Sequence, residues 1–227
     1  MDLGIDEATI TNLEAKRQIG EQVARLAQDG DVIGAGSGST SYCVVRALGA
    51  RLAAGELREV IVVPTSLEVA STAAASGLTV LQAGLRRLDW VFDGADEVDP
   101  AGSLIKGRGG AMLREKLAFT MTERRYVVVD ASKFVDVLGT RFAVPFEVVP
   151  EAAEHFAARV AALGAEAVPR MAGGGKDGPV ITELGNLVLD VRLQPVEEDV
   201  IASLERLPGV LTSGAFFGYE AELITVE

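Results

Sequence analysis

Residues 93–116, which read DGADEVDPAGSLIKGRGGAMLREK, gather carboxylates, lysines and two groups of glycines in one short stretch of the chain. Carboxylates and lysines can exchange protons with a substrate, and a lysine can also neutralise negative charge that develops during a reaction. Any one acid here is more often a solvated surface group, because charged side chains are mostly exposed. The combination of these residue types in one segment therefore indicates a site for acid–base chemistry.

The position of this segment along the chain supports a site. It follows residues 88–92, LDWVF, a short apolar run typical of a buried strand, so Asp93 and Asp96 are expected where that strand ends. Strand ends are where α/β folds keep function. Lys106 then stands in front of glycines whose backbone can approach a ligand closely, and Glu115 is expected in an early turn of the following helix.

A second polar cluster, residues 31–40 with the sequence DVIGAGSGST, runs from an apolar strand through a Gly/Ser loop into a helix expected over residues 42–54. Backbone amides and the positive end of a helix dipole make such a turn an anion site, and Ser39 and Thr40 can donate hydroxyls to a phosphate. A dinucleotide motif fits less well, because Ser39 stands where a third glycine would be expected. A small phosphorylated ligand is favoured, and a plain strand-to-helix turn with a Ser/Thr cap remains the alternative.

Two further strand ends carry polar residues. Pro64, Thr65 and Ser66 follow an expected strand at residues 60–63, and residues 130–133, DASK, follow one at residues 126–129. The carboxyl ends of parallel strands share one edge of a sheet, so these residues are expected near the first two clusters. Lys133 is a candidate point-charge partner for phosphate, with a solvated loop lysine as the alternative, and Ser66 is also explained as a helix cap.

The elements that must position these clusters alternate between helix and strand. Expected are helices at 12–27, 42–54, 67–76 and 112–123, and strands at 32–34, 60–63, 80–82, 90–92 and 126–130. This alternation predicts an α/β fold with a Rossmann-like, mostly parallel sheet flanked by helices, over residues 1–143 and 216–227. The last apolar segment, residues 221–226, is expected to return to that sheet as a strand.

Residues 144–215 follow a different order. Expected are strands at 146–149, 166–170, 180–182, 187–191 and 210–215, helices at 151–163 and 197–207, and a glycine-rich turn at 173–175. The β-α-β-β-α-β order predicts a smaller α+β, ferredoxin-like domain. The residues Leu184, Gly185 and Asn186 suit a hairpin turn, and nothing in this domain has the look of catalysis.

Composition limits the chemistry further. The 227 residues are 48 % apolar and carry a net charge of −12, which argues against nucleic acid and requires local cations for any anionic ligand. One cysteine, Cys43, and one histidine, His155, argue against a disulfide framework, a zinc site and a Ser-His-Asp triad. Cys43 is expected to be a buried, inert thiol. The sequence has no signal peptide and no run of about 20 apolar residues, so a cytoplasmic location is expected.

These motifs, taken together, resemble the type A ribose-5-phosphate isomerases. GSGST, PTS, DGADEVD, KGRGGAMLREK and DASK occur in the family's order and at family-like spacing, and the match covers nearly the whole chain. The resemblance implies an enzyme that interconverts ribose 5-phosphate and ribulose 5-phosphate in the pentose phosphate pathway, with no metal and no organic cofactor. It also implies a small sugar-phosphate substrate. No nucleic-acid or membrane partner is expected from the charge and the apolar pattern, and apolar residues of the small domain and of the C-terminal strand favour a homo-oligomer, either a dimer or a tetramer.

The resemblance assigns roles to individual residues. Glu115 is the implied general base that moves a proton between two substrate carbons, and Asp93 is implied in ring opening and in proton exchange with the sugar oxygens. Lys106 is expected to neutralise the enediolate oxygen, and Asp96 to bind sugar hydroxyls and hold Lys106 in place. The remaining implied substrate contacts, most of them to phosphate, are Ser37, Gly38, Ser39, Thr40, Gly94, Ala95, Gly107, Arg108, Gly109, Lys133 and Lys16.

Departures from the family pattern are few. The first loop reads GSGST where GTGST is usual, and residues 182–186 read TELGN where the family tends toward TDNGN. Alternatives to the isomerase are a sugar-phosphate sensor, which would lose the acid–base residues, and a lactonase or amino-sugar-phosphate deaminase on the same fold. Retention of Asp93, Asp96, Lys106 and Glu115 argues against a sensor. A deaminase would call for histidine near the site, and His155 falls in the expected small domain.

Overall fold

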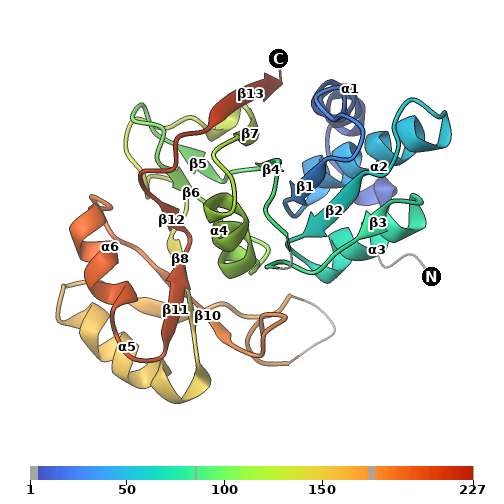
Figure 1. The fold of residues 1–227 in the computed structure, drawn as a ribbon. Helices are drawn as coiled ribbons and strands as arrows, with labels where there is room; N and C mark the ends of the chain where they lie inside the picture. The colour runs from blue at the N-terminus through green and yellow to red at the C-terminus, as the bar shows by residue number, and fades with distance from the viewer. Residues whose placement is uncertain (1–4, 85, 174–176, 227) are drawn as a thin grey trace. The chain divides into compact units, whose positions relative to one another are not determined.

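The structure is a computed structural model that describes residues 5–84, 86–173 and 177–226 (Figure 1). Its contacts group the chain into two compact units. Unit 1 comprises Met1–Gly94, Arg114–Ser132 and Glu220–Glu227, and unit 2 comprises Ala95–Leu113 and Lys133–Tyr219. Unit 2 therefore includes three segments that the sequence assigned to the larger domain: 95–113, 133–143 and 216–219. The domain boundaries predicted at 143/144 and 215/216 remain predictions.

Unit 1 is built on a six-stranded sheet in the order β13-β7-β4-β1-β2-β3, and every neighbouring pair is parallel. Its strands are β1 (Val32–Ala35), β2 (Ile61–Pro64), β3 (Thr79–Val80), β4 (Trp90–Asp93), β7 (Arg125–Asp130) and β13 (Glu222–Val226). Numbered within the unit, this is the Rossmann order 3-2-1-4-5-6, and it reverses direction between β1 and β4. The predicted α/β fold is confirmed, including the return of the last segment to the sheet.

Apolar residues explain why these strands form the centre of the unit. All four residues of β1 and of β4 are buried, as expected for parallel strands that are covered on both faces. Trp90 packs against Phe92 and Tyr126, with ring centroids 5.8 and 5.7 Å apart. Helices α1 (Leu13–Ala24), α2 (Ser39–Ala53) and α3 (Leu67–Ala75) contribute to the same core, and α1 lies beside α2 (Figure 1). No helix of the described ranges is long and apolar enough to cross a membrane.

Unit 2 contains the predicted β-α-β-β-α-β module, with β8 (Val144–Val148), α5 (Ala153–Ala161), β9 (Ala167–Pro169), β10 (Leu187–Val191), α6 (Glu198–Glu205) and β11 (Val210–Ser213). Its sheet is antiparallel in the order β11-β8-β10-β9. Numbered within the module, this order is 4-1-3-2. Each of the two helices therefore connects two strands of the same sheet. Phe146 and Phe156, with centroids 5.0 Å apart, lie in the core between sheet and helices.

A second sheet in unit 2 was not predicted. It has three strands of two residues each, β5 (Glu97–Val98), β6 (Leu104–Ile105) and β12 (Ala215–Phe216), in the order β12-β6-β5. Two residues are too few to show a periodic pattern, so the sequence held no signal for them. Short 3₁₀ helices at Glu7–Thr9 (η1), Ala131–Lys133 (η2) and Pro150–Ala152 (η3) complete the described elements.

Some predicted elements need correction. The helix expected from residue 42 begins at Ser39, because Gly38 adopts a φ of 93° and its carbonyl accepts from the Tyr42 amide at 2.9 Å. The strand expected at 180–182 is wrong: the structure has only isolated bridges there, such as Ile181 with Leu187. Helix α4 (Met112–Thr120) ends before residue 123. Residues 174 and 175 of the predicted glycine-rich turn lie outside the described residues.

Candidate active site

Gly36 and Asp93 lie against each other where the strand order of unit 1 reverses. Gly36 follows β1 and its amide donates to the Phe92 carbonyl of β4 at 2.8 Å. A Cβ atom placed on Gly36 would lie 2.0 Å from Cγ of Asp93, so only glycine fits this position. The crevice at the carboxyl ends of strands, at such a reversal, is the usual ligand site of open α/β sheets. The expected proximity of the glycine loop and the first aspartate is therefore observed.

Hydroxyl groups and a lysine surround the start of α2. The hydroxyl oxygens of Ser37 and Thr65 are 2.7 Å apart, and Thr65 also donates to the Ala35 carbonyl at 3.1 Å. The Lys16 ammonium, from α1, donates to Oγ of Ser39 at 2.9 Å. A cation, hydroxyls and a helix N-terminus thus converge in unit 1, and each of them favours an anion. Ser66 is a helix cap, whose Oγ accepts from the Val69 amide at 3.3 Å.

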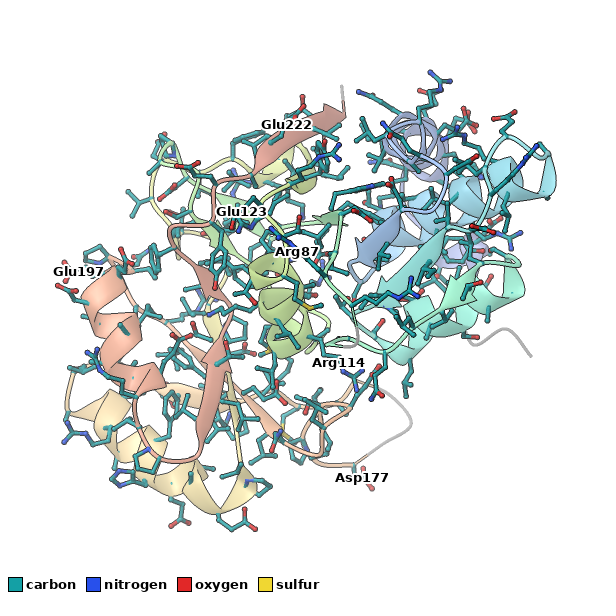
Figure 2. All side chains as sticks on the ribbon, in the orientation of Figure 1. Arg87, Arg114, Glu123, Asp177, Glu197 and Glu222 are labelled. Atoms are coloured by element: carbon teal, nitrogen blue, oxygen red, sulfur yellow. The ribbon has the colours of Figure 1, made fainter. Side chains whose placement is uncertain are left out.

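Two carboxylates of unit 1 are almost fully buried. Asp93, the last residue of β4, is 2 % exposed, and its Oδ1 accepts from the Gly94 amide at 2.7 Å. Glu115 is 4 % exposed and lies in the first turn of α4, next to Arg114, which Figure 2 labels. Acidic side chains are seldom buried to this extent unless they are paired or functional. Many other acids project from the surface, such as Glu197 at the start of α6 and Glu222 on β13 (Figure 2).

Lys106 and Asp96 belong to unit 2. Lys106 follows β6 and is 3 % exposed; its amide donates to the Gly214 carbonyl at 2.8 Å, and its Nζ lies 5.7 Å from the centroid of the Phe216 ring. Asp96 is half-buried, and its Oδ2 accepts from the Arg108 amide at 3.2 Å. Asp96 therefore fixes the backbone that directly follows Lys106.

The glycine loop after Lys106 is held from both sides. Gly107 has a φ of 95°, and a Cβ there would lie 3.0 Å from Cγ of Pro145. The Arg170 guanidinium donates to the carbonyls of Gly107 and Arg108 at 2.9 and 2.8 Å, and it forms a two-bonded ion pair with Asp190. Arg170 was not predicted as a site residue, because nothing in the sequence ties it to a loop 62 residues away. Within this loop the amide of Arg108, one of the expected substrate contacts, donates to Asp96.

Lys133 and Glu97 lie in another part of unit 2. Lys133 ends η2, is half-buried, and has its Nζ 5.8 Å from the centroid of the Phe142 ring. Glu97 is fully buried and accepts from the amides of Gly139, Arg141 and Phe142 at 2.6, 2.6 and 2.7 Å. The role of Glu97 among the acids of DGADEVD was not predicted, because residue type alone does not distinguish a carboxylate that binds backbone from one that binds substrate.

Several of these residues line a cavity of about 860 Å³ in unit 2. Its lining includes Asp96, Arg108, Arg141, Phe142, Arg170 and Arg192. Four arginines line this cavity against three acids, Asp96, Glu166 and Asp190, and Arg170 is paired with Asp190, in a chain of net charge −12. Local cations of this kind are what an acidic protein needs to attract an anionic ligand.

Cysteine and histidine, the two remaining reactive residue types, occur once each in the sequence. Cys43 is buried in α2, as predicted, and burial, with a smaller contribution from Glu7, raises the pKa of its thiol. His155 is exposed on α5. Within the described ranges, no group of three or more His, Cys, Asp or Glu side chains is arranged to hold a metal ion.

Comparison with known proteins agrees with the arrangement of motifs. The family model "Ribose 5-phosphate isomerase A (phosphoriboisomerase A)" matches residues 61–227. Ribose-5-phosphate isomerase A of Thermosynechococcus vestitus is 42 % identical over 210 residues, which cover 89 % of each chain. The ribose 5-phosphate isomerase A structure from Methanocaldococcus jannaschii superposes with a TM-score of 0.89 at 33 % identity, covering 96 % of both chains. A D-ribose-5-phosphate isomerase in complex with phospho-erythronic acid gives a TM-score of 0.90 at 33 % identity and the same coverage. The resemblance inferred from the sequence motifs is thus confirmed, and the chain belongs to the ribose 5-phosphate isomerase A family.

Proposed function

We propose that this protein interconverts D-ribose 5-phosphate and D-ribulose 5-phosphate in the non-oxidative pentose phosphate pathway. The observation that carries the proposal is the burial of three charged residues, Asp93, Lys106 and Glu115, in a chain of this family. Relatives that match about nine-tenths of the chain bear the name of this activity. One solved relative is in complex with phospho-erythronic acid, a phosphorylated sugar acid.

The reaction needs one group that moves a proton between neighbouring carbons, and we assign it to Glu115. In the direction of the ketose, the carboxylate removes the proton from C2, the C–H electrons form a C1–C2 double bond, and O1 becomes negatively charged. The carboxylic acid then returns the proton to C1 while the O2 proton is lost and the C2 carbonyl forms. Burial of Glu115 supports this role, because water around the base would compete for the proton.

Asp93 and Lys106 act on the oxygen atoms of the substrate in this proposal. Asp93 opens the furanose ring and exchanges protons with the oxygens, so that one proton passes in net terms from O2 to O1. Lys106 neutralises the enediolate oxygen, and a buried ammonium does this more strongly than one in water. Asp96 binds the sugar hydroxyls and keeps the backbone after Lys106 in place through the Arg108 amide.

The phosphate is assigned to residues 37–40, Lys16 and Lys133. The hydrogen bond of Lys16 to Ser39, at the N-terminus of α2, supports the assignment, because all of these groups favour negative charge. Gly94, Ala95 and the loop residues Gly107, Arg108 and Gly109 complete the proposed substrate contacts.

The chain also exposes apolar side chains that favour self-association, and we propose a homo-oligomer, either a dimer or a tetramer. In unit 2, Met171, Leu184 and Ile181 are 63, 48 and 46 % exposed, and Leu223 on β13 of unit 1 is 38 % exposed. Apolar patches on a protein surface commonly mark interfaces between chains.

The purified protein mixed with ribose 5-phosphate and a chelator tests the activity. We expect rapid formation of ribulose 5-phosphate at a rate that the chelator does not change. Tight binding of ribose 5-phosphate without conversion would contradict the proposal and would favour a sugar-phosphate sensor.

A further inference from the structure

Glu97 is a fully buried carboxylate that the proposed reaction does not use. Each of its oxygens accepts backbone amides: Oε2 that of Gly139 at 2.6 Å, and Oε1 those of Arg141 and Phe142 at 2.6 and 2.7 Å. Three short charge-assisted hydrogen bonds to one turn fix the backbone of that turn firmly. The turn lies directly before β8 and carries Phe142.

The other residue of β5 holds the segment that carries Lys133. Val98 forms a parallel bridge with Phe134, and its carbonyl accepts from the Val135 amide at 3.0 Å. Strand β5 therefore holds two segments side by side. Through Val98 it fixes the backbone next to Lys133, and through Glu97 it fixes the backbone of Phe142.

The two segments meet where the Lys133 ammonium approaches the Phe142 ring. The distance from Nζ to the ring centroid is 5.8 Å, which is within the range of a cation–π interaction. A lysine side chain has four rotatable bonds, and an aromatic face beside the ammonium limits the positions that it samples. A restricted ammonium loses less conformational entropy when it binds an anion.

We propose that Glu97 is a positioning residue for Lys133: it fixes the turn of residues 139–142 so that the Phe142 ring holds the Lys133 ammonium ready for the substrate phosphate. This inference rests on the phosphate-binding role proposed above for Lys133. It makes β5 the link between the acid–base motif, which it continues from Asp96, and the phosphate lysine.

Two variants perturb the two steps of this chain of contacts. Glu97→Gln keeps the size of the side chain but replaces one acceptor oxygen with an NH₂ group, which faces an amide donor of the turn. Phe142→Leu keeps an apolar side chain but removes the aromatic face. Glu147→Gln is the matched control: Glu147 is also buried in unit 2 and also holds a turn, through Thr182 and Asn186, but it has no described contact with Lys133.

The measurements are KM and kcat for ribose 5-phosphate, the competitive inhibition constant of inorganic phosphate, and the melting temperature. Glu97→Gln and Phe142→Leu are expected to raise KM and the inhibition constant together, by about three- to tenfold, with kcat within about twofold of the unmodified protein. Glu147→Gln is expected to lower the melting temperature and to leave both constants unchanged. A melting temperature lowered in all three variants, with KM and the inhibition constant unchanged, would reduce Glu97 to a purely structural residue and overturn the inference.

A double-variant comparison separates this inference from the proposed role of Lys133. Lys133→Ala alone should weaken the binding of inorganic phosphate. Adding Phe142→Leu to this variant should weaken phosphate binding no further, because the ring acts through the ammonium. If Lys133→Ala leaves phosphate binding intact, the proposed role of Lys133 is wrong, and the inference fails with it. If Lys133→Ala weakens phosphate binding and Phe142→Leu alone does not, Lys133 still binds phosphate and only the positioning role of Glu97 is wrong. Titration of inorganic phosphate by calorimetry gives the same comparison without turnover.

Discussion

Asp93, Lys106 and Glu115 are charged side chains that the fold keeps almost out of water, with 2, 3 and 4 % of their surface exposed. A buried charge costs folding free energy unless other groups compensate it. Low local dielectric also strengthens every electrostatic interaction of such a group with a substrate. Four charged side chains of one short segment, Asp93, Glu97, Lys106 and Glu115, are buried in this way. Three backbone amides compensate Glu97, and the other three are the residues that act on the substrate in the proposed reaction.

Residue types and spacing predicted this set, but not the environment of each member. Asp93, Asp96 and Glu97 belong to one motif, yet the first is buried beside Gly36, the second binds a loop amide, and the third binds three amides of a distant turn. These differences arise from contacts between segments that are far apart in the sequence. Arg170 escaped prediction for the same reason.

Lys16 provides a test at the residue scale. Replacement of Lys16 by alanine removes the ammonium that donates to Ser39, and it should raise both KM for ribose 5-phosphate and the inhibition constant of inorganic phosphate about tenfold. Arg17→Ala is the control, because Arg17 is exposed and pairs with Glu7. Equal increases of KM and of the inhibition constant in the two variants would show that the loss of one positive charge weakens binding, and would contradict a contact between Lys16 and phosphate.

Cys43 gives a second residue-scale prediction. Because burial raises the pKa of its thiol, the reactive thiolate forms only at higher pH than in the unfolded chain. Alkylation by iodoacetamide at pH 8, followed by mass spectrometry, should be at least about tenfold slower in the native protein than in denaturant. The contribution of this thiol to stability should be fully present below its unfolded pKa and should decline as pH rises above it. Equal alkylation rates would show that Cys43 is accessible.

At the scale of elements, the turn between β1 and α2 controls how closely the glycine loop approaches Asp93. Gly36→Ala would place a methyl group 2.0 Å from Cγ of Asp93, so β1 and β4 must separate or the carboxylate must move. We expect the free energy of unfolding to fall by about 1 to 3 kcal/mol, together with a loss of kcat. Gly173→Ala is the control for thermal unfolding, because a Cβ there meets open space. Full activity in Gly36→Ala would remove Asp93 from the proposed reaction.

Elements with strong local patterns were predicted well, and short ones were not. Strands β1, β4 and β7 are continuous apolar runs, because parallel strands are covered on both faces, and each lies within one residue of its expected bounds. Strands β5, β6 and β12 have two residues each and form only through partners elsewhere in unit 2. The strand wrongly expected at 180–182 is apolar in sequence, but Ile181 is 46 % exposed and makes only one isolated bridge.

At the scale of the whole molecule, the net charge of −12 makes local cations necessary for an anionic substrate. Three lysines proposed for the substrate, Lys16, Lys106 and Lys133, come from three separate parts of the chain. The fold class followed from the alternation of helices and strands. The grouping of residues 95–113 with unit 2 could not be predicted from that alternation. It depends on the sheet of β5, β6 and β12, whose two-residue strands give no pattern in the sequence.

Self-association is the prediction for the whole molecule. Light scattering at micromolar concentration should give a mass of twice or four times the 23.8 kDa of one chain. Met171→Asp and Leu223→Asp place a charge on the exposed apolar surface of unit 2 and of unit 1 respectively, and the variant that dissociates identifies the interface. A mass of one chain at every concentration would contradict the proposed oligomer.

The most direct test of the central claim is proton transfer by Glu115→Gln, measured in D₂O. The unmodified protein should form ribulose 5-phosphate, and solvent deuterium should appear at C1 to the extent that the Glu115 carboxylic acid exchanges its proton with solvent before returning it. Glu115→Gln should lower both rates by about three to five orders of magnitude while ribose 5-phosphate binding is largely kept, because the amide cannot act as a base. Near-normal turnover and deuterium incorporation in Glu115→Gln would show that another residue removes the proton.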